Sequence, residues 1–195
     1  MNKEQNNAVK DEKKRSNTYR SATYLAKIAM LSALGCILLV IEFPIFPATP
    51  WLKLNFSDLP TLLASFMFGP VSGIIVNAVK VGITLLARGT SSGFVGDISN
   101  LISGTLYALT AGIIYKIRKD KIGAILALAA GSFVFCVSMI LCNAFILLPA
   151  YGITEKTAIV PLLLWTLLFN VIKTVATSLL TFLLYKKTHK LMQKF

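Results

Sequence analysis

Long apolar runs, broken by short polar segments, fill most of the chain after residue 21. A helix needs roughly 20 apolar residues to cross the hydrocarbon core of a bilayer. The runs predict helices at about 22–41, 96–115, 122–149 and 158–185, with two more helices inside 59–87. The pattern therefore predicts an all-α membrane protein with six transmembrane helices.

The division of the 59–87 run depends on Gly69 and Pro70. Proline disfavours helix in the residue before it, yet it begins a new helix well. The second helix is then roughly half the length of a full span, so it must be packed against its neighbours. Ser57 or Asp58 is placed to cap its first turn.

Composition and charge support a membrane protein of defined orientation. Of the 195 residues only 14% are charged and 55% are hydrophobic, whereas a soluble domain carries about 25% charged residues. The net charge of +12 comes from basic residues gathered in positions 1–20, in the segment 116–121 and in the C-terminal tail. With six helices these clusters lie on one side, and the positive-inside rule makes that side, with both termini, cytoplasmic.

This distribution also predicts the domain organisation and the partner of the charge. We expect a cytoplasmic basic arm at 1–20, a six-helix membrane domain at 21–188 and a cytoplasmic tail at 189–195. The basic clusters face the anionic lipid of the cytoplasmic leaflet, and no nucleic acid partner is expected.

Lys173 lies inside the last apolar run, where a cation is unusual. A charge at bilayer depth costs about 2.5–3.5 kcal/mol on insertion scales, so such a residue usually faces a polar interior or a ligand. Asn170 precedes it by one helical turn, and Thr166 and Thr177 share its helical face. These residues predict a polar pocket among the helices.

Other polar residues are expected at the same depth. Asn143 lies in the outer half of the fifth helix, and Asp97 and Asn100 open the fourth helix on the same side. They are placed to converge on Asn170 and Lys173, although each alone also fits a structural hydrogen bond. Lys80, in the outer half of the third helix, either snorkels outward or lines the pocket, and the sequence leaves both readings open.

The outer loop before the second helix is rich in both aromatic and polar residues. Its sequence is FPIFPATPWLKLNFSDLP, and the polar positions include Lys53, Asn55, Ser57 and Asp58. An aromatic belt at the membrane interface is one interpretation. We favour a lid over an outward-facing pocket, because aromatic and polar groups are dense in the same segment.

Small residues repeat at four-residue spacing in two helices. The first helix carries Ala22-x-x-x-Ala26 and Ala29-x-x-x-Ala33, and the fourth carries Gly104-x-x-x-Ala108-x-x-x-Gly112. Such stripes let helices approach closely in lipid. The pattern by itself favours packing within the monomer over docking of a partner membrane protein.

The sequence argues against an enzyme. The acidic residues are scattered singly and the one histidine, His189, lies in the C-terminal tail, so no metal or acid–base cluster is apparent and no cofactor is expected. No phosphate-binding G-x-x-x-x-G-K-[ST] segment occurs, so active transport by this chain needs a separate source of energy.

Several segments together resemble one family. The stretch from Phe43 to Pro70, with LKLNFSDLP and FGPVSG, the segment SSGFVGDISNLISG and the NVIK motif of the last helix resemble S components of energy-coupling-factor (ECF) vitamin transporters. The resemblance is nearest to the riboflavin-specific type and covers about residues 22–188.

The resemblance implies a six-helix binder without catalytic activity in the bacterial plasma membrane. Such a protein captures vitamin outside and delivers it with a transmembrane coupling protein and two cytoplasmic ATPases. It implies that Ala29 and Ala33 form the docking face for the coupling protein, which reverses the preference for packing in the first helix.

The resemblance also suggests the residues that bind riboflavin. It implies contacts to the isoalloxazine ring from Asn143, Asn170 and Lys173, and a lid at 52–58. Asn55 departs from the aspartate expected there. The candidate binding residues are Asn143, Asn170, Lys173, Leu52, Lys53, Asn55, Asp58, Lys80, Asn100 and Thr166.

Two other functions remain open from the sequence. An S component for another vitamin, such as thiamine or a queuosine precursor, differs from a riboflavin binder by only a few side chains of the pocket. An integral membrane enzyme acting on lipid is less favoured, because such enzymes show clustered Asp or His. A proton- or ion-coupled carrier is disfavoured because none of the acidic residues is expected in the middle of a helix.

Overall fold

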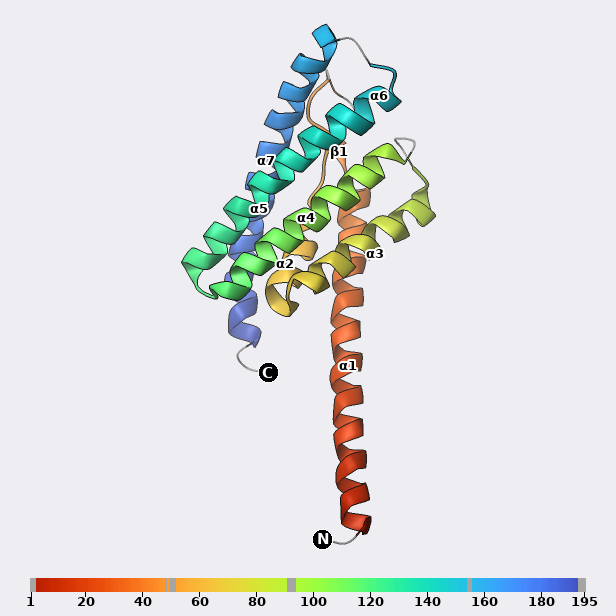
Figure 1. The fold of residues 1–195 in the computed structure, drawn as a ribbon, viewed down its shortest axis with the longest axis vertical. Coiled ribbons are helices and arrows are strands. Elements are labelled where there is room, and N and C mark those ends of the chain that lie inside the picture. Colours follow the sequence, from red (N-terminus) through yellow and green to blue (C-terminus); the bar gives the residue numbers. More distant parts are fainter. Residues whose placement is uncertain (1–2, 48, 50–51, 91–93, 154–155, 193–195) are drawn as a thin grey trace.

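The protein is a bundle of long helices with a small hairpin at one end (Figure 1). The computed structural model describes residues 3–47, 49, 52–90, 94–153 and 156–192, and side chains only from residue 21 to residue 185 within those ranges and outside 156–158. The elements are α1 (Lys3–Val40), β1 (Phe43–Pro44), β2 (Lys53–Leu54), α2 (Asp58–Phe68), α3 (Pro70–Arg88), α4 (Val95–Ile117), α5 (Lys121–Cys142), the π-helix η1 (Asn143–Leu147), α6 (Leu148–Ala150) and α7 (Lys156–Met192).

The helices match the apolar runs of the sequence. Five are long and apolar enough to cross a membrane, at Ser21–Val40, Pro70–Arg88, Val95–Ile117, Lys121–Ala150 and Ile159–Tyr185, and the Asp58–Phe68 helix is shorter. The expected six-helix arrangement with a short second helix is therefore confirmed. α1 and α7 extend beyond their apolar runs, to Lys3 and Met192, through segments rich in polar residues.

The break between α2 and α3 follows the prediction. Gly69 has φ 98°, a region that favours glycine, and its N–H donates to the Ser65 carbonyl, while Pro70 begins α3. The expected cap of α2 is wrong, because neither Ser57 nor Asp58 makes a side-chain capping hydrogen bond. Both side chains are instead drawn into a buried polar network, described below.

α4 packs against α2 and α3 through its stripe of small residues. A Cβ on Gly104 would lie 2.6 Å from Asn77 Oδ1 of α3, and one on Gly112 would lie 2.8 Å from Pro70 Cα. Ala108 between them is fully buried, and its carbonyl accepts a 2.6 Å hydrogen bond from Ser65 Oγ of α2. The stripe therefore serves packing within the monomer, as expected for this helix.

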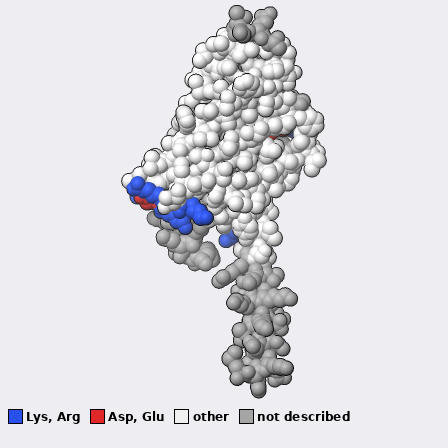
Figure 2. Space-filling model, in the orientation of Figure 1, with Lys and Arg blue, Asp and Glu red and all other residues white. Residues whose placement is uncertain are grey.

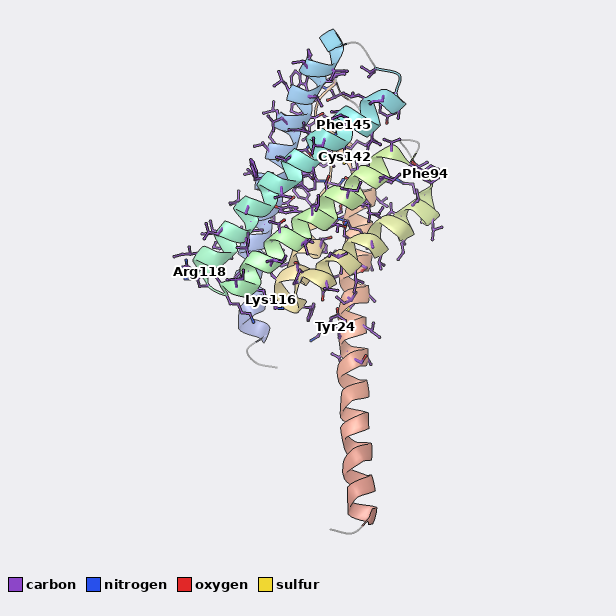
Figure 3. The ribbon with its side chains drawn as sticks, in the orientation of Figure 1. Tyr24, Phe94, Lys116, Arg118, Cys142 and Phe145 are labelled. Carbon is purple, nitrogen blue, oxygen red and sulfur yellow. The ribbon has the colours of Figure 1, made fainter. Side chains whose placement is uncertain are left out.

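The outer surface of the bundle is apolar. Leu86, Ile117 and Phe145 are 89%, 81% and 75% exposed, and Figure 3 shows side chains projecting outward from α3, α4 and α5. On the face seen in Figure 2, Lys and Arg gather at one end, where the described residues Lys116, Arg118, Lys119 and Lys121 surround the α4–α5 turn. Such a surface suits lipid along the bundle and a charged interface at its end.

The basic α4–α5 turn is fixed by a helix cap. The Asp120 carboxylate accepts a hydrogen bond from the Gly123 N–H at the start of α5 and pairs with Arg118 at 2.8 Å. The backbone hydrogen bond, followed by the Arg118 contact, lowers the pKa of Asp120 below its ordinary value. α1 begins and α7 ends on this same side of the bundle, and the hairpin lies at the opposite end (Figure 1).

Candidate ligand-binding site

A cavity lies at the hairpin end of the bundle and encloses about 860 Å³, including its open mouth. Its walls come from the end of α1, the β1–β2 hairpin, α3, α4, the α5–η1 junction and α7. Segments that are far apart in the sequence therefore meet around one opening at this end of the bundle.

Most of the candidate residues surround this cavity. Seven of the ten line it, namely Leu52, Lys53, Asn55, Asn100, Asn143, Asn170 and Lys173. Asp58, Lys80 and Thr166 are buried nearby but do not line it. The seven come from separate segments of the chain, so their convergence is a property of the fold rather than of any one motif.

Two amide side chains present oxygen acceptors at the cavity. Asn143 Nδ2 donates to the Met139 carbonyl at 2.8 Å, and Asn170 Nδ2 donates to the Thr166 carbonyl at 2.8 Å, each one helical turn back. Their Oδ1 atoms are buried and have no hydrogen-bond partner among the described residues. Because buried polar atoms are costly when unpaired, two such acceptors in a cavity wall are suited to a ligand that carries hydrogen-bond donors.

The π-helix η1 gives Asn143 its place. A π turn inserts one extra residue into the helical register, and such turns are frequent at functional sites. η1 continues α5 without a break, and Asn143 and Leu147 of η1 both line the cavity. The hydropathy pattern predicts the helix but carries no signal for this local widening.

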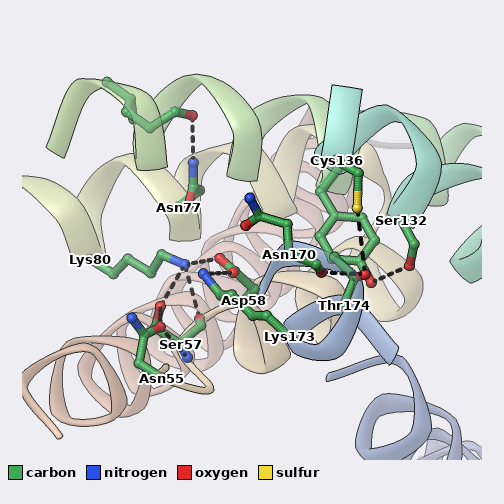
Figure 4. A network of polar contacts seen from close by, with 12 residues as sticks. Asn55, Ser57, Asp58, Asn77, Lys80, Ser132, Cys136, Asn170, Lys173 and Thr174 are labelled. Atoms are coloured by element: carbon green, nitrogen blue, oxygen red, sulfur yellow. Dashed lines mark hydrogen bonds and ion pairs between the residues drawn. The ribbon is translucent and has the colours of Figure 1, made fainter. Parts of the chain in front are cut away.

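Lys173 of α7 shares a buried carboxylate with a second lysine (Figure 4). Lys173 Nζ lies 2.9 Å from Asp58 Oδ2, and Lys80 Nζ lies 2.7 Å from Asp58 Oδ1. The three residues are at most 4% exposed, and they come from α7, α2 and α3. Lys173 Nζ also lies 5.1 Å from the Phe135 ring centroid, within cation–π range.

The structure places Lys80 in the interior of the bundle. Its ammonium points inward to Asp58 and Ser57, so it does not snorkel to the surface, and it does not line the cavity. The sequence could not decide this, because Asp58 is distant in the chain and opens α2 rather than standing inside a transmembrane run. The two residues lie behind the cavity wall.

Glu42 joins three segments at the mouth of the cavity. Its Oε1 accepts from Lys53 of β2 at 3.0 Å and from Arg88 at the end of α3 at 2.8 Å. All three residues line the cavity. Sequence reasoning did not select Glu42 or Arg88 as site residues. The sequence feature that marks them is a charged residue at the end of an apolar run.

The hairpin and its loop pack against α7 beside the cavity. Phe46 lies 5.1 Å from Trp165 and 6.5 Å from Phe169, measured between ring centroids. Leu52 and Leu54 form one buried apolar cluster with Phe169. The lid interpretation agrees with this position beside the cavity, whereas Trp51 of the same loop lies outside the described residues.

A hydroxyl cluster ties α7 to its neighbours beneath the cavity. Tyr107 of α4, Ser132 of α5 and Ser178 of α7 lie within 2.8–3.1 Å of one another. In the same region Cys136 lies 3.9 Å from Thr174 Oγ1. These polar contacts fix α7 in rotation, so that Asn170 and Lys173 face inward.

α1 presents opposite faces to the bundle and to its surroundings. Ile28 and Ser32 are buried, and a Cβ on Gly35 would lie 3.3 Å from the stem of Lys80 in α3. Ala29 and Ala33 are exposed on the other face. The small residues expected to dock a partner are thus accessible.

The site offers groups suited to hydrogen bonding and apolar contact. Within the described residues no three His, Cys, Asp or Glu side chains converge as a metal site would require. The cavity offers apolar walls, buried amide oxygens and the Lys173 ammonium. These groups fix the orientation of a ligand through hydrogen bonds and apolar contact.

Comparisons with known proteins agree on one family. A family model described as the ECF transporter substrate-specific component matches residues 23–185. The riboflavin transporter RibU of Staphylococcus aureus (strain TCH60) is 39% identical over 170 residues, which cover 84% of this chain and 88% of that protein. The riboflavin transporter FmnP of Bacillus subtilis (strain 168) is 30% identical over 172 residues, covering 84% of this chain and 90% of that protein.

A solved structure shares the fold. It is described as the S component of a bacterial ECF transporter, and it superposes with a TM-score of 0.77 at 37% sequence identity. The match covers 88% of this chain and 98% of that one. The helix arrangement described above is therefore that of an S component.

Proposed function

Because this chain belongs to the family of ECF transporter substrate-specific components, we propose that it is a riboflavin-binding S component. It captures the vitamin outside the cell and delivers it inward together with a separate coupling protein and two ATPases. The relatives that bear the name riboflavin transporter match most of this chain, which favours riboflavin over other vitamins.

The observation that carries the proposal is the convergence of Asn143, Asn170 and Lys173 on one cavity. The isoalloxazine ring of riboflavin is flat and uncharged, and its imide edge carries one N–H donor between two carbonyl acceptors. Buried Oδ1 acceptors match the donor, and the Lys173 ammonium matches a carbonyl oxygen. Apolar residues such as Leu52 and Phe169 supply contact area for the ring faces.

The proposal assigns the pocket to the outside of a bacterial plasma membrane. The cavity lies at the end of the bundle away from the basic α4–α5 turn, and basic segments favour the cytoplasm. The β1–β2 hairpin acts as the lid.

Ala29 and Ala33 on the accessible face of α1 dock the coupling protein, since small residues allow close helix approach in lipid.

An S component for thiamine or a queuosine precursor is the principal alternative, and a lipid-modifying enzyme is disfavoured by the transporter family. An uptake experiment separates them. Cells that lack their own riboflavin uptake are given this chain with the coupling protein and ATPases, and accumulation of labelled riboflavin, thiamine and the queuosine precursor is measured. Uptake of riboflavin only when both the chain and the coupling module are present is the expected result. Uptake of thiamine or the queuosine precursor alone would contradict the proposal.

A further inference from the structure

The two lysines that share Asp58 are not equivalent. Lys80 Nζ donates to Asp58 Oδ1 at 2.7 Å, to the Ser57 carbonyl at 3.0 Å and to Ser57 Oγ at 3.2 Å. An ammonium has three donors, so Lys80 is fully committed to protein acceptors. Its position behind the cavity wall leaves it without ligand contact.

The Lys173 ammonium is paired with one carboxylate oxygen and keeps further hydrogen-bond donors. Among the described residues this ammonium has one oxygen partner, Asp58 Oδ2 at 2.9 Å. At this distance the contact uses at most one of the three donors of the ammonium. Lys173 lines the cavity, and its remaining donors are available to a ligand.

The count of charges explains how Lys173 stays available. Two cations share one carboxylate, so one positive charge is in surplus at a buried site. Lys80 takes one oxygen of Asp58 and draws the carboxylate toward α3. Without Lys80, Lys173 would be the single cation paired with the Asp58 carboxylate. The Lys173 ammonium would then point toward Asp58 rather than toward the cavity.

The same lysine also fixes a residue of the lid. Ser57, which accepts from Lys80, donates from its Oγ to Asn55 Oδ1 at 2.8 Å, and its N–H donates to the same oxygen at 3.3 Å. Asn55 lines the cavity, and Figure 4 shows its contact with Ser57. One continuous chain of contacts therefore joins the lid side of the cavity to Lys173 of α7.

We propose that Lys80 and Asp58 are positioning residues, which act on the ligand through Lys173 and Asn55 without touching it. This inference rests on the proposed function, because riboflavin is the ligand used to test it. It also accounts for a costly arrangement. Three buried charges are retained where an apolar core would pack as well, because the surplus cation is needed at the cavity wall.

A double-mutant cycle tests the inference on the purified full-length chain. The variants are K80M, K173Q and the combination, and riboflavin Kd is measured by quenching of flavin fluorescence. K173Q keeps an uncharged donor, so that residual binding stays measurable. We expect K80M to weaken binding at least about tenfold in the parent and by about threefold or less in the K173Q background, where only the contact through Ser57 and Asn55 remains. K27M removes a lysine at the other end of the bundle and controls for loss of charge.

Equal losses from K80M in both backgrounds would overturn the inference, because Lys80 would then support the fold rather than Lys173. S57A repeats the cycle with a smaller change, in case K80M fails to fold. It removes one acceptor of Lys80 and one donor to Asn55, and we expect a smaller loss with the same dependence on Lys173. If the parent itself does not bind riboflavin, the proposed function fails, and the inference with it.

Discussion

At the scale of single residues, the buried charges show what the membrane setting demands. A lysine at the depth of Lys173 costs about 2.5–3.5 kcal/mol on insertion scales, and Asp58 offsets that cost by lying 2.9 Å away. Removing one partner of a buried ion pair usually costs about 3–5 kcal/mol, because a charge is left unpaired. Here the loss of Lys173 is milder, since Asp58 keeps Lys80 at 2.7 Å.

This sharing leads to a prediction for the two α7 residues of the site. Lys173→Ala and Asn170→Ala should each weaken riboflavin binding by about 10- to 100-fold, the size of one lost hydrogen bond involving a charged or buried group. Folding should be largely retained, as judged by thermal unfolding in detergent. Val175→Ala, an exposed position on the same helix, is the matched control. Parent-like binding by both site variants would show that the pocket is misplaced.

The residues that sequence reasoning missed share a physical cause. Glu42 and Arg88 meet across the cavity mouth from positions 46 residues apart, and the acceptors of Lys80 come from Ser57 and Asp58, 23 and 22 residues earlier. Hydropathy indicates which residues cross the membrane, but it does not indicate which side chains meet. A polar residue inside an apolar run can be recognised from the sequence whichever way its side chain points. For that reason sequence reasoning selected Lys173, Asn170 and Asn143.

At the scale of elements, helix lengths and breaks were predictable and local distortions were not. The apolar runs and the Gly69-Pro70 pair indicated the helix order, including the short α2. The π-helix η1 and the β1–β2 pairing depend on contacts between segments, so the local sequence pattern does not predict them. The small-residue stripes of α4 and α1 have the same spacing in the sequence. The α4 stripe is buried, whereas Ala29 and Ala33 of the α1 stripe are exposed.

The α4 stripe makes a clear prediction about stability. Gly104→Ala places a methyl group 2.6 Å from Asn77 Oδ1, so either the Asn77 amide gives up its hydrogen bonds to Leu101 and Thr105 or the helices separate, at a cost of about 1–3 kcal/mol. Gly82→Ala is the control within α3, because a Cβ there meets nothing within 4 Å. Thermal unfolding should show a lower midpoint for the first variant and an equal or higher one for the second. The reverse order would contradict the packing of α3 on α4.

The α1 stripe makes a prediction about partners. Ala29→Leu and Ala33→Leu should abolish riboflavin uptake with the coupling module, because a bulky side chain keeps the partner helix away. Riboflavin binding by the isolated chain should be unchanged, since both residues are exposed and lie outside the cavity. Ala129→Leu on the exposed face of α5 is the control. Loss of binding in the α1 variants would assign this face to packing instead.

At the scale of the whole molecule, the bundle has two unlike ends. One carries the cavity and the β1–β2 hairpin, and the other carries the basic α4–α5 turn, the start of α1 and the end of α7 (Figure 1). A binder that must take its ligand from one side and present a docking face to partners in the membrane needs such a division. The apolar outer surface between the two ends fits the hydrocarbon layer.

The orientation of these ends is open to a direct test. In a background without the natural cysteines, Lys119→Cys should react with a membrane-impermeant thiol reagent only after the cells are opened. Pro47→Cys, between β1 and β2, should react with intact cells, because the cavity end faces outward. Both positions are exposed, so access depends on the side of the membrane. The opposite labelling pattern would invert the proposed topology.

The most direct test of the central claim is an equilibrium titration of the purified chain with riboflavin, followed by quenching of flavin fluorescence. The account predicts tight quenching that saturates at one riboflavin per chain and is weakened by Lys173→Ala. Thiamine should not compete, because it lacks the imide edge that the amide oxygens match. An absence of quenching, together with tight binding of thiamine or another vitamin, would contradict the account.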